Sequence, residues 1–161
     1  MFVDRRVFDH DEANELFEFL DTLDVEYRKP YMRFGKTAHV PRGQASFTFS
    51  PDIHYDYKVS GGSPPNLVMC DKLKEITTRV NKVLNTNFNT ILLNKYIDGN
   101  DCIGFHHDRE NGWAPSSGFA TLSFGACTIS STLFAIILSE LVHSAKTMIC
   151  DAAPPLLSDL K

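Results

Sequence analysis

The chain of 161 residues is long enough for one domain and leaves no room for a second of comparable size. A hydrophobic fraction of 43% and an aromatic fraction of 11% predict a folded core and argue against disorder. The net charge of −4 gives no overall attraction to nucleic acid. The four cysteines show no CxxC or CxxH spacing, which argues against a structural zinc site or a disulfide framework and favours a reducing compartment.

The N-terminal segment, MFVDRRVFDHDE, lacks the apolar core of a signal peptide. Apolar residues at helical spacing predict an amphipathic helix over residues 11–23, with Asp9 or Asp11 as its cap. Residues 1–27 carry nine acids and two bases, whereas residues 28–51 carry five bases and no acid. This local basic segment predicts a surface that contacts phosphate, although an ordinary solvated loop explains the composition equally well.

Aromatic residues punctuated by Pro and Gly predict strands and hairpins over residues 28–65. Residues 71–84 predict a second helix, whose apolar face carries Leu73, Ile76, Val80 and either Val83 or Leu84. Short strands follow at FNTILLNKY, CIGFHHD and FATLSFGAC, with a turn at residues 98–100. The apolar run over residues 133–138 is too short to span a membrane. Together these elements predict an α+β domain built on a curled antiparallel sheet.

Two pairs of residues in the predicted strands are candidates for chemistry. Side chains two apart on a strand point to the same face, so His106 converges with Asp108, and Asn94 with Tyr96. A histidine and a carboxylate supply two corners of the triad that binds iron(II) and leaves positions open. The amide and the phenol are donors that an acidic cosubstrate would need. On spacing alone, a surface pair and a core tyrosine remain the simpler interpretations.

The combination of motifs is more specific than either pair. The string NKYIDGNDCIGFHHDRENGWAPSSGFATLSFGAC closely resembles the AlkB pattern of Asn-x-Tyr, a Gly turn, Ile-Gly-x-His-x-Asp, a polar loop and Ser-Phe-Gly-Ala. Upstream, RFGKTAHVPRGQASF and YDYKVSGG are similar to further segments of that family. The resemblance covers roughly residues 5–127 and is strongest with the branch of the second and third AlkB homologues.

The resemblance implies an oxidative demethylase of N-alkylated bases in DNA or RNA, which uses iron(II), 2-oxoglutarate and O₂. It implies a double-stranded β-helix (jelly-roll, cupin-like) fold with N-terminal helices, incomplete at its C-terminal end. The dioxygenase domain would occupy residues 1–127, and residues 128–161 would form a divergent tail that does not match the family. We expect a monomer that does not bind membranes and is intracellular, in the nucleus if the source is eukaryotic.

Site roles are carried over by position. The resemblance makes His106 and Asp108 the catalytic iron ligands, and it makes Asn94 and Tyr96 the residues that contact 2-oxoglutarate. Substrate-contacting positions are Phe34, Gly35, Lys36, Arg42, Tyr57, Val59, Ser60 and Glu110. Among them, Phe34 falls where the duplex-acting homologue fills the gap left by a flipped base. Lys36 and Arg42 would contact phosphate or shape the mouth of the base pocket.

The sequence departs from the family in two places. Arg109 replaces the acid that helps to recognise the target base, which leaves base preference open. The family also supplies a second iron-binding histidine and two arginines beyond the segment matched here. After Cys127 this chain contains no arginine and one histidine, His143, in a predicted helix. The alternative interpretations are therefore a catalytically inactive nucleic-acid-binding remnant and a truncated isoform that lacks the distal His and Arg.

Overall fold

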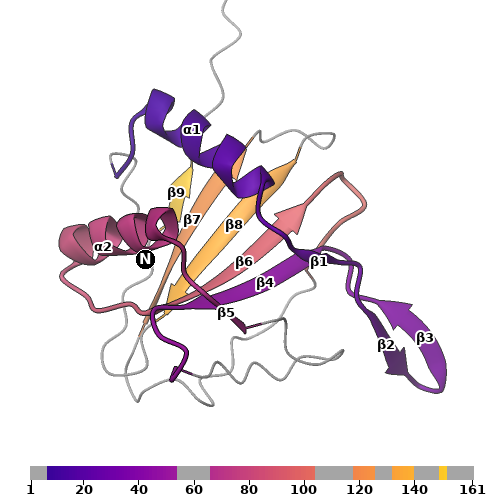
Figure 1. The fold of residues 1–161 in the computed structure, drawn as a ribbon. Coiled ribbons are helices and arrows are strands. Elements are labelled where there is room, and N and C mark those ends of the chain that lie inside the picture. Colours follow the sequence, from indigo (N-terminus) through magenta and orange to yellow (C-terminus); the bar gives the residue numbers. More distant parts are fainter. Residues whose placement is uncertain (1–6, 54–65, 104–117, 126–131, 140–148, 152–161) are drawn as a thin grey trace, which may run out of the picture.

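A computed structural model describes residues 7–53, 66–103, 118–125, 132–139 and 149–151 of the chain. Within these residues the chain forms two helices and nine strands (Figure 1). The helices are α1 (His10–Asp21) and α2 (Asp71–Leu84). The strands are β1 (Glu26–Tyr27), β2 (Pro30–Arg33), β3 (Lys36–His39), β4 (Gly43–Thr48), β5 (Asn66–Val68), β6 (Thr90–Tyr96), β7 (Phe119–Gly125), β8 (Leu133–Ser139) and β9 (Ile149–Asp151).

Both predicted helices are confirmed, and local chemistry explains where they begin and end. A reciprocal capping box starts α1: the Asp9 carboxylate accepts from the Glu12 backbone N–H, and the Glu12 carboxylate accepts from the Asp9 backbone N–H, both at 2.9 Å. Helix α2 ends at Asn85, which takes the left-handed conformation with φ of 53°. Of the two candidate core residues at its end, Leu84 is buried and Val83 is 46% exposed.

Seven strands form one sheet in the order β1-β4-β6-β8-β7-β9, with β5 paired to β4. The central pairs β4–β6, β6–β8 and β8–β7 are antiparallel, and β5 and β9 pair in parallel with β4 and β7. Helices lying on a largely antiparallel sheet confirm the α+β class, in agreement with the jelly-roll fold that the resemblance implies. No described helix is long and apolar enough to cross a membrane.

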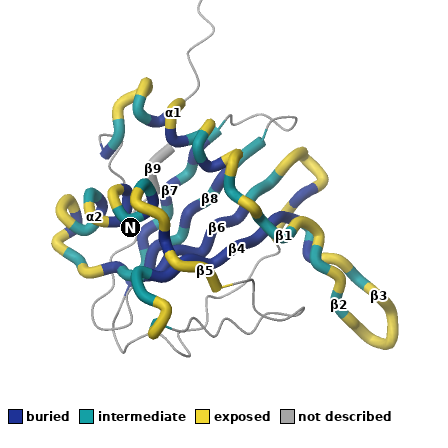
Figure 2. The backbone as a smooth tube through the Cα atoms, in the orientation of Figure 1, coloured by how far each residue is buried: buried dark blue, intermediate teal, exposed yellow. Residues whose placement is uncertain are grey.

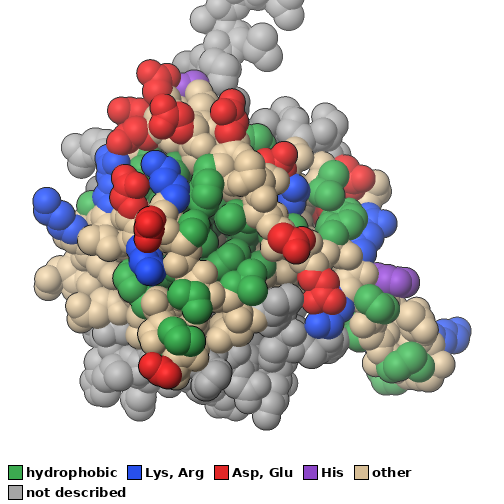
Figure 3. All heavy atoms as spheres, viewed as in Figure 1, with side chains coloured by type: hydrophobic (Ala, Val, Ile, Leu, Met, Phe, Trp, Pro, Cys, Tyr) green, Lys and Arg blue, Asp and Glu red, His purple; other side chains and the backbone are tan. Residues whose placement is uncertain are grey.

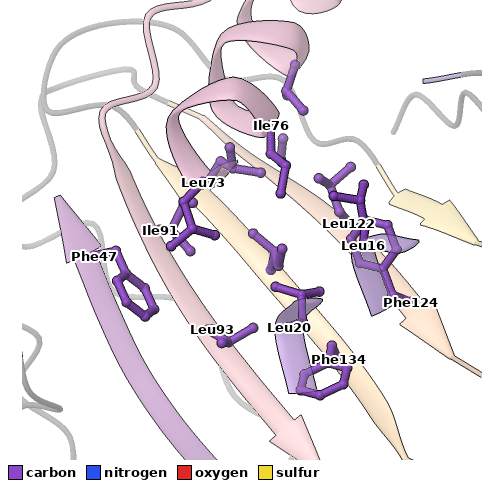
Figure 4. Packing of buried hydrophobic residues seen from close by; sticks show 14 of the residues in the cluster. Leu16, Leu20, Phe47, Leu73, Ile76, Ile91, Leu93, Leu122, Phe124 and Phe134 are labelled. Atoms are coloured by element: carbon purple, nitrogen blue, oxygen red, sulfur yellow. The ribbon is translucent and has the colours of Figure 1, made fainter. Parts of the chain in front are cut away.

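The hydrophobic core lies between the two helices and one face of the sheet (Figures 2 and 4). Because side chains alternate along each strand, one set of positions packs under the helices. Leu93 on β6 has Ile136 on β8 as its cross-strand partner, and Ile136 in turn pairs with Leu122 on β7. All three are fully buried, as are Leu20 of α1 and Val80 of α2.

Strand β8 lies inside the sheet, although it comes from the segment that the sequence predicted to be a divergent tail. It is hydrogen-bonded along its whole length to β6 on one side and to β7 on the other. Its helix-facing residues Phe134, Ile136 and Leu138 are completely buried. The Phe134 ring also meets Phe17 of α1 edge-on, with 5.3 Å between the ring centroids. Part of the segment predicted to be a tail is therefore a structural element of the core.

Strands β2 and β3 form a separate hairpin that projects from the main sheet (Figure 1). Arg33 pairs with Lys36, which leaves Phe34 and Gly35 as a two-residue loop. Both loop residues have positive φ, 49° and 73°, which is the geometry of a type I′ turn. The twist of that turn suits a tight antiparallel hairpin, so the loop holds Phe34 at the tip.

The other predicted strands have mixed outcomes. The structure confirms the strands at FNTILLNKY and FATLSFGAC, as β6 and β7, and the turn at residues 98–100. Cys102 and Ile103, at the start of the predicted CIGFHHD strand, lie in a loop, and the remainder of that segment falls outside the described residues. The sequence did not predict β8, because its run of apolar residues lacks the alternation of a half-exposed strand.

Candidate functional site

The face of the sheet opposite the helices carries the polar residues of the central strands. Alternation places Gln44, Ser46 and Thr48 of β4 beside Asn94, Leu92 and Thr90 of β6, in that order. All six are buried. We call this surface of the central strands the polar face. Buried polar side chains need hydrogen-bond partners, so such a face is expected to hold a network or a ligand.

Asn94 is the centre of one such network. Its side chain is 1% exposed, and its amide oxygen Oδ1 accepts from Arg42 Nε and from Gln44 Nε2, both at 2.9 Å. Gln44 is the direct cross-strand partner of Asn94, and Arg42 lies two residues before Gln44. Three polar side chains, from β6, from β4 and from the residue just before β4, therefore meet at one buried point.

The Arg42 guanidinium brings a buried positive charge to this point. Arg42 is 7% exposed and also donates from Nη1 to the Cys102 carbonyl at 3.4 Å. Within the described part of the chain, only neutral oxygens face the guanidinium, and no carboxylate pairs with it. A buried cation is costly unless an anion or several dipoles compensate it, so the surroundings of Asn94 favour an acidic ligand.

Of the two roles expected for Arg42, its burial favours shaping a pocket over contacting phosphate. Tyr96, the other expected cosubstrate contact, lies two residues after Asn94 on β6 and is half-buried. Alternation puts Tyr96 on the same side of the strand as Asn94. The structure thus brings Arg42, Asn94 and Tyr96, all of which carry N–H or O–H groups, to one side of the sheet.

A second network joins the base of the hairpin to the loop after β6. Asp101 has a fully buried side chain that accepts from the Tyr27 hydroxyl at 2.9 and 3.0 Å, from Arg28 Nη2 at 3.0 Å and from the Ile97 backbone N–H at 2.8 Å. Burial alone would raise the pKa of the Asp101 carboxyl, but the Ile97, Tyr27 and Arg28 bonds together hold it below its usual range. Burial and the bond to Asp101 in turn raise the pKa of Tyr27, whose hydroxyl remains a donor.

Backbone hydrogen bonds extend this connection toward Asn94. The Cys102 N–H donates to the Pro41 carbonyl at 2.8 Å, and the Arg28 N–H donates to the Arg42 carbonyl at 3.2 Å. Both legs of the hairpin and the loop over residues 97–102 are therefore held together at one place. His106 follows this loop by a few residues in the sequence.

The hairpin tip is the most exposed apolar feature among the described residues. Phe34 is 92% exposed, and the guanidinium carbon of Arg33 lies 5.6 Å from its ring centroid. Lys36 and Gly35 are exposed beside it. Space-filling views show acidic side chains gathered over α1, whereas the hairpin displays hydrophobic and basic side chains (Figure 3). An exposed aromatic ring between two cations suits a partner with stacked rings and negative charge.

The predicted iron ligands His106 and Asp108 lie outside the described residues. The same is true of the predicted base-pocket residues Tyr57, Val59, Ser60 and Glu110. No group of three His, Cys, Asp or Glu side chains that could hold a metal occurs within the described residues. The roles of the two predicted iron ligands and of the four predicted base-pocket residues therefore stay predictions.

Sequence reasoning did not assign a role to Gln44 or to Asp101. Gln44 lies in the PRGQ segment that carries part of the resemblance, and strand alternation could have grouped it with Arg42, two residues earlier. Its contact with Asn94 depends on the tertiary pairing of β4 with β6. No local pattern identifies Asp101, because its partners Tyr27 and Arg28 are more than seventy residues away in the sequence.

The chain matches the sequence profile of the 2OG-Fe(II) oxygenase superfamily over residues 1–130. It is 38% identical over 125 residues to a Homo sapiens protein named DNA oxidative demethylase ALKBH2, covering 75% of this chain and 46% of that relative. The Mus musculus protein of the same name is 37% identical, with coverage of 75% and 51%. The Arabidopsis thaliana protein is 32% identical over 118 residues, with coverage of 66% and 35%. The chain spans about half, or less, of the length of these relatives.

Proposed function

Since the chain belongs to the 2OG-Fe(II) oxygenase superfamily, as an AlkB-type member, we propose that it acts as an oxidative demethylase of N-alkylated bases in DNA. The relatives carry this activity in their names, and the AlkB-like motifs of this chain include the residues expected to bind iron and the cosubstrate. The structural observation that carries the choice of nucleic acid as substrate is the exposed Phe34 at the tip of a basic hairpin.

The described residues fit the cosubstrate. 2-Oxoglutarate is a dianion, and the polar face offers it a buried amide at Asn94, the nearby Arg42 cation and the Tyr96 side chain. In this proposal His106 and Asp108 hold the iron. Iron(II) with 2-oxoglutarate and O₂ supplies the oxidation that removes the N-alkyl carbon as an aldehyde, with succinate and CO₂ as the other products.

The hairpin would help to extrude the alkylated base from the DNA rather than take part in the oxidation. A base inside a duplex cannot reach a buried site and must be extruded, at a cost of a few kcal/mol. Alkylation on the pairing edge lowers that cost because it weakens the base pair. Phe34 is positioned at the end of a stiff two-residue turn, where its ring can stack in the vacated space while Arg33 and Lys36 contact phosphate. The tip therefore favours a double-stranded substrate.

The proposal is tested by formaldehyde release from duplex DNA that carries one base N-methylated on its pairing edge. The full chain is incubated with iron(II), 2-oxoglutarate and O₂, and Asp108→Ala is expected to abolish release. Phe34→Ala is expected to lower turnover on the duplex by roughly tenfold, from the loss of one stacking contact, and to leave single-stranded turnover nearly unchanged. Met32→Ala is a matched control, since Met32 is an exposed apolar residue of the same hairpin but not of its tip.

Wild-type protein that releases no formaldehyde under these conditions would contradict the proposal. Equal losses for Phe34→Ala on both substrates would remove the role of the tip in duplex opening. RNA as an additional substrate, a monomeric state and a nuclear location remain parts of the proposal, to be tested with a methylated RNA strand, by sedimentation and by imaging of the tagged protein.

A further inference from the structure

The orientation of the Asn94 side-chain amide follows from the chemistry of Arg42. The Nε–H of an arginine donates and never accepts, because the guanidinium keeps its protons in proteins. Arg42 Nε lies 2.9 Å from one terminal atom of Asn94, so that atom must be the oxygen.

The orientation of the Gln44 side-chain amide follows from that of Asn94. The Asn94 oxygen also faces a terminal atom of Gln44 at 2.9 Å, and an oxygen can only accept. Gln44 therefore presents its NH₂ group to Asn94. Two donors occupy the two lone pairs of Oδ1, and the Asn94 NH₂ group is turned away from both of them. No acceptor among the described residues contacts that NH₂ group, although Asn94 is almost completely buried.

We infer that Arg42 and Gln44 are positioning residues that hold the Asn94 amide with its NH₂ group directed at the acidic cosubstrate. This inference rests on the proposed function, because it takes the ligand of Asn94 to be a carboxylate. It gives Gln44 a role in orienting Asn94, whereas the sequence motifs assigned Gln44 no role. Two donors on one oxygen convert an amide, which can donate or accept, into a group that only donates.

An unconstrained asparagine would serve a carboxylate less well. Rotation of the terminal amide by half a turn exchanges its oxygen and nitrogen, and the two orientations are close in intrinsic energy. The wrong orientation places an oxygen against the anion. Strand pairing supports the observed one, since Gln44 and Asn94 are cross-strand partners in β4 and β6, each of which has strands on both sides.

The test is a double-mutant cycle read by the affinity for 2-oxoglutarate in the presence of Mn(II), measured by calorimetry on the full chain. Gln44→Met removes the donor and keeps the length of the side chain. We expect it to weaken affinity by about fivefold, the effect of one neutral hydrogen bond. In an Asn94→Ala background the same change is expected to have no effect. Ser46→Ala is the matched control, since Ser46 lies on the same face of β4, two residues from Gln44, and bonds to Asn66 instead.

An equal loss from Gln44→Met in both backgrounds would overturn the inference, because the effect would then not act through Asn94. So would a loss of the same size from Ser46→Ala. A Gln44→Met variant with unchanged affinity would also overturn it. Circular dichroism melting of each variant reports separately whether the fold has been disturbed.

A second measurement does not require a bound ligand. Nuclear Overhauser contacts from the Arg42 Nε–H proton report which amide lies beside it. We expect a strong contact to the Gln44 NH₂ protons and a weaker one to those of Asn94, and the reverse order would overturn the inference. If wild-type protein does not bind 2-oxoglutarate, the proposed function fails for this chain, whereas the amide contacts still decide the orientation of Asn94.

Discussion

Replacing Ile136 with alanine tests whether the segment after β7 completes the core. Ile136 is fully buried on β8, with fully buried Leu93 and Leu122 as its partners on either side. The change removes roughly three methylene equivalents, worth about 0.8 kcal/mol each when buried, or about 2.4 kcal/mol. The cavity left among fixed neighbours adds about 1 kcal/mol more, so we expect a loss of about 3–4 kcal/mol in the free energy of unfolding.

The next residue on the strand provides the control. Ile137→Ala is the identical chemical change, but Ile137 lies on the opposite side of β8 and is only half-buried. Its expected cost is about 1 kcal/mol. Urea unfolding followed by far-ultraviolet circular dichroism gives both free energies, provided that the slope of the free energy of unfolding against urea concentration is the same in the variants as in wild type. Equal losses for the two variants, or a loss below about 0.5 kcal/mol for Ile136→Ala, would refute the central position of β8.

Three further predictions concern single interactions. The pKa of Asp101 is lowered in the folded state, so its ionised carboxylate stabilises the fold at pH values above its unfolded pKa of about 3.9. This contribution is lost as the pH falls through the lower pKa of the folded state. Acid unfolding curves should show the loss in wild type and not in Asp101→Asn. Gly35→Ala meets no neighbouring atom but puts a side chain at φ of 73°, so it should weaken the hairpin by about 1 kcal/mol, seen as faster amide exchange in β2 and β3. Asp9→Ala removes one half of the capping box and should lower the free energy of unfolding by about 1 kcal/mol in urea titrations, whereas the Asp11→Ala control should change it little.

Local patterns were sufficient for the helices and for two central strands. The periodicity that predicted α2 reflects a real apolar face, and the Asp9 cap follows from a local hydrogen bond to a residue three positions later. β8 was beyond such reasoning. Its residues are apolar on both sides, as in a strand buried between two others, and a run of this kind is also typical of a buried helix. Only the long-range pairing with β6 and β7 decides between them.

The candidate site was predictable in part for the same reason. Strand alternation correctly grouped Asn94 with Tyr96, because both lie on β6. The burial of Arg42 was not predictable from a local basic segment, since that segment also contains the exposed Arg33 and Lys36. Tertiary pairing of β4 with β6 separates a buried guanidinium from solvent-facing cations that are close to it in the sequence.

The isolation of the β2–β3 hairpin has a consequence for how the protein can evolve. Its two strands hydrogen-bond to each other rather than to the main sheet, and the tip at Phe34 buries almost nothing (Figure 2). Replacement of the Phe34 side chain therefore carries little penalty in folding, unlike a change at Gly35, and in the proposed function selection can act on Phe34 through substrate choice alone. If the proposed function holds, exchange of this one loop between relatives should change the preference for duplex or single-stranded DNA without the compensating mutations that a buried surface demands.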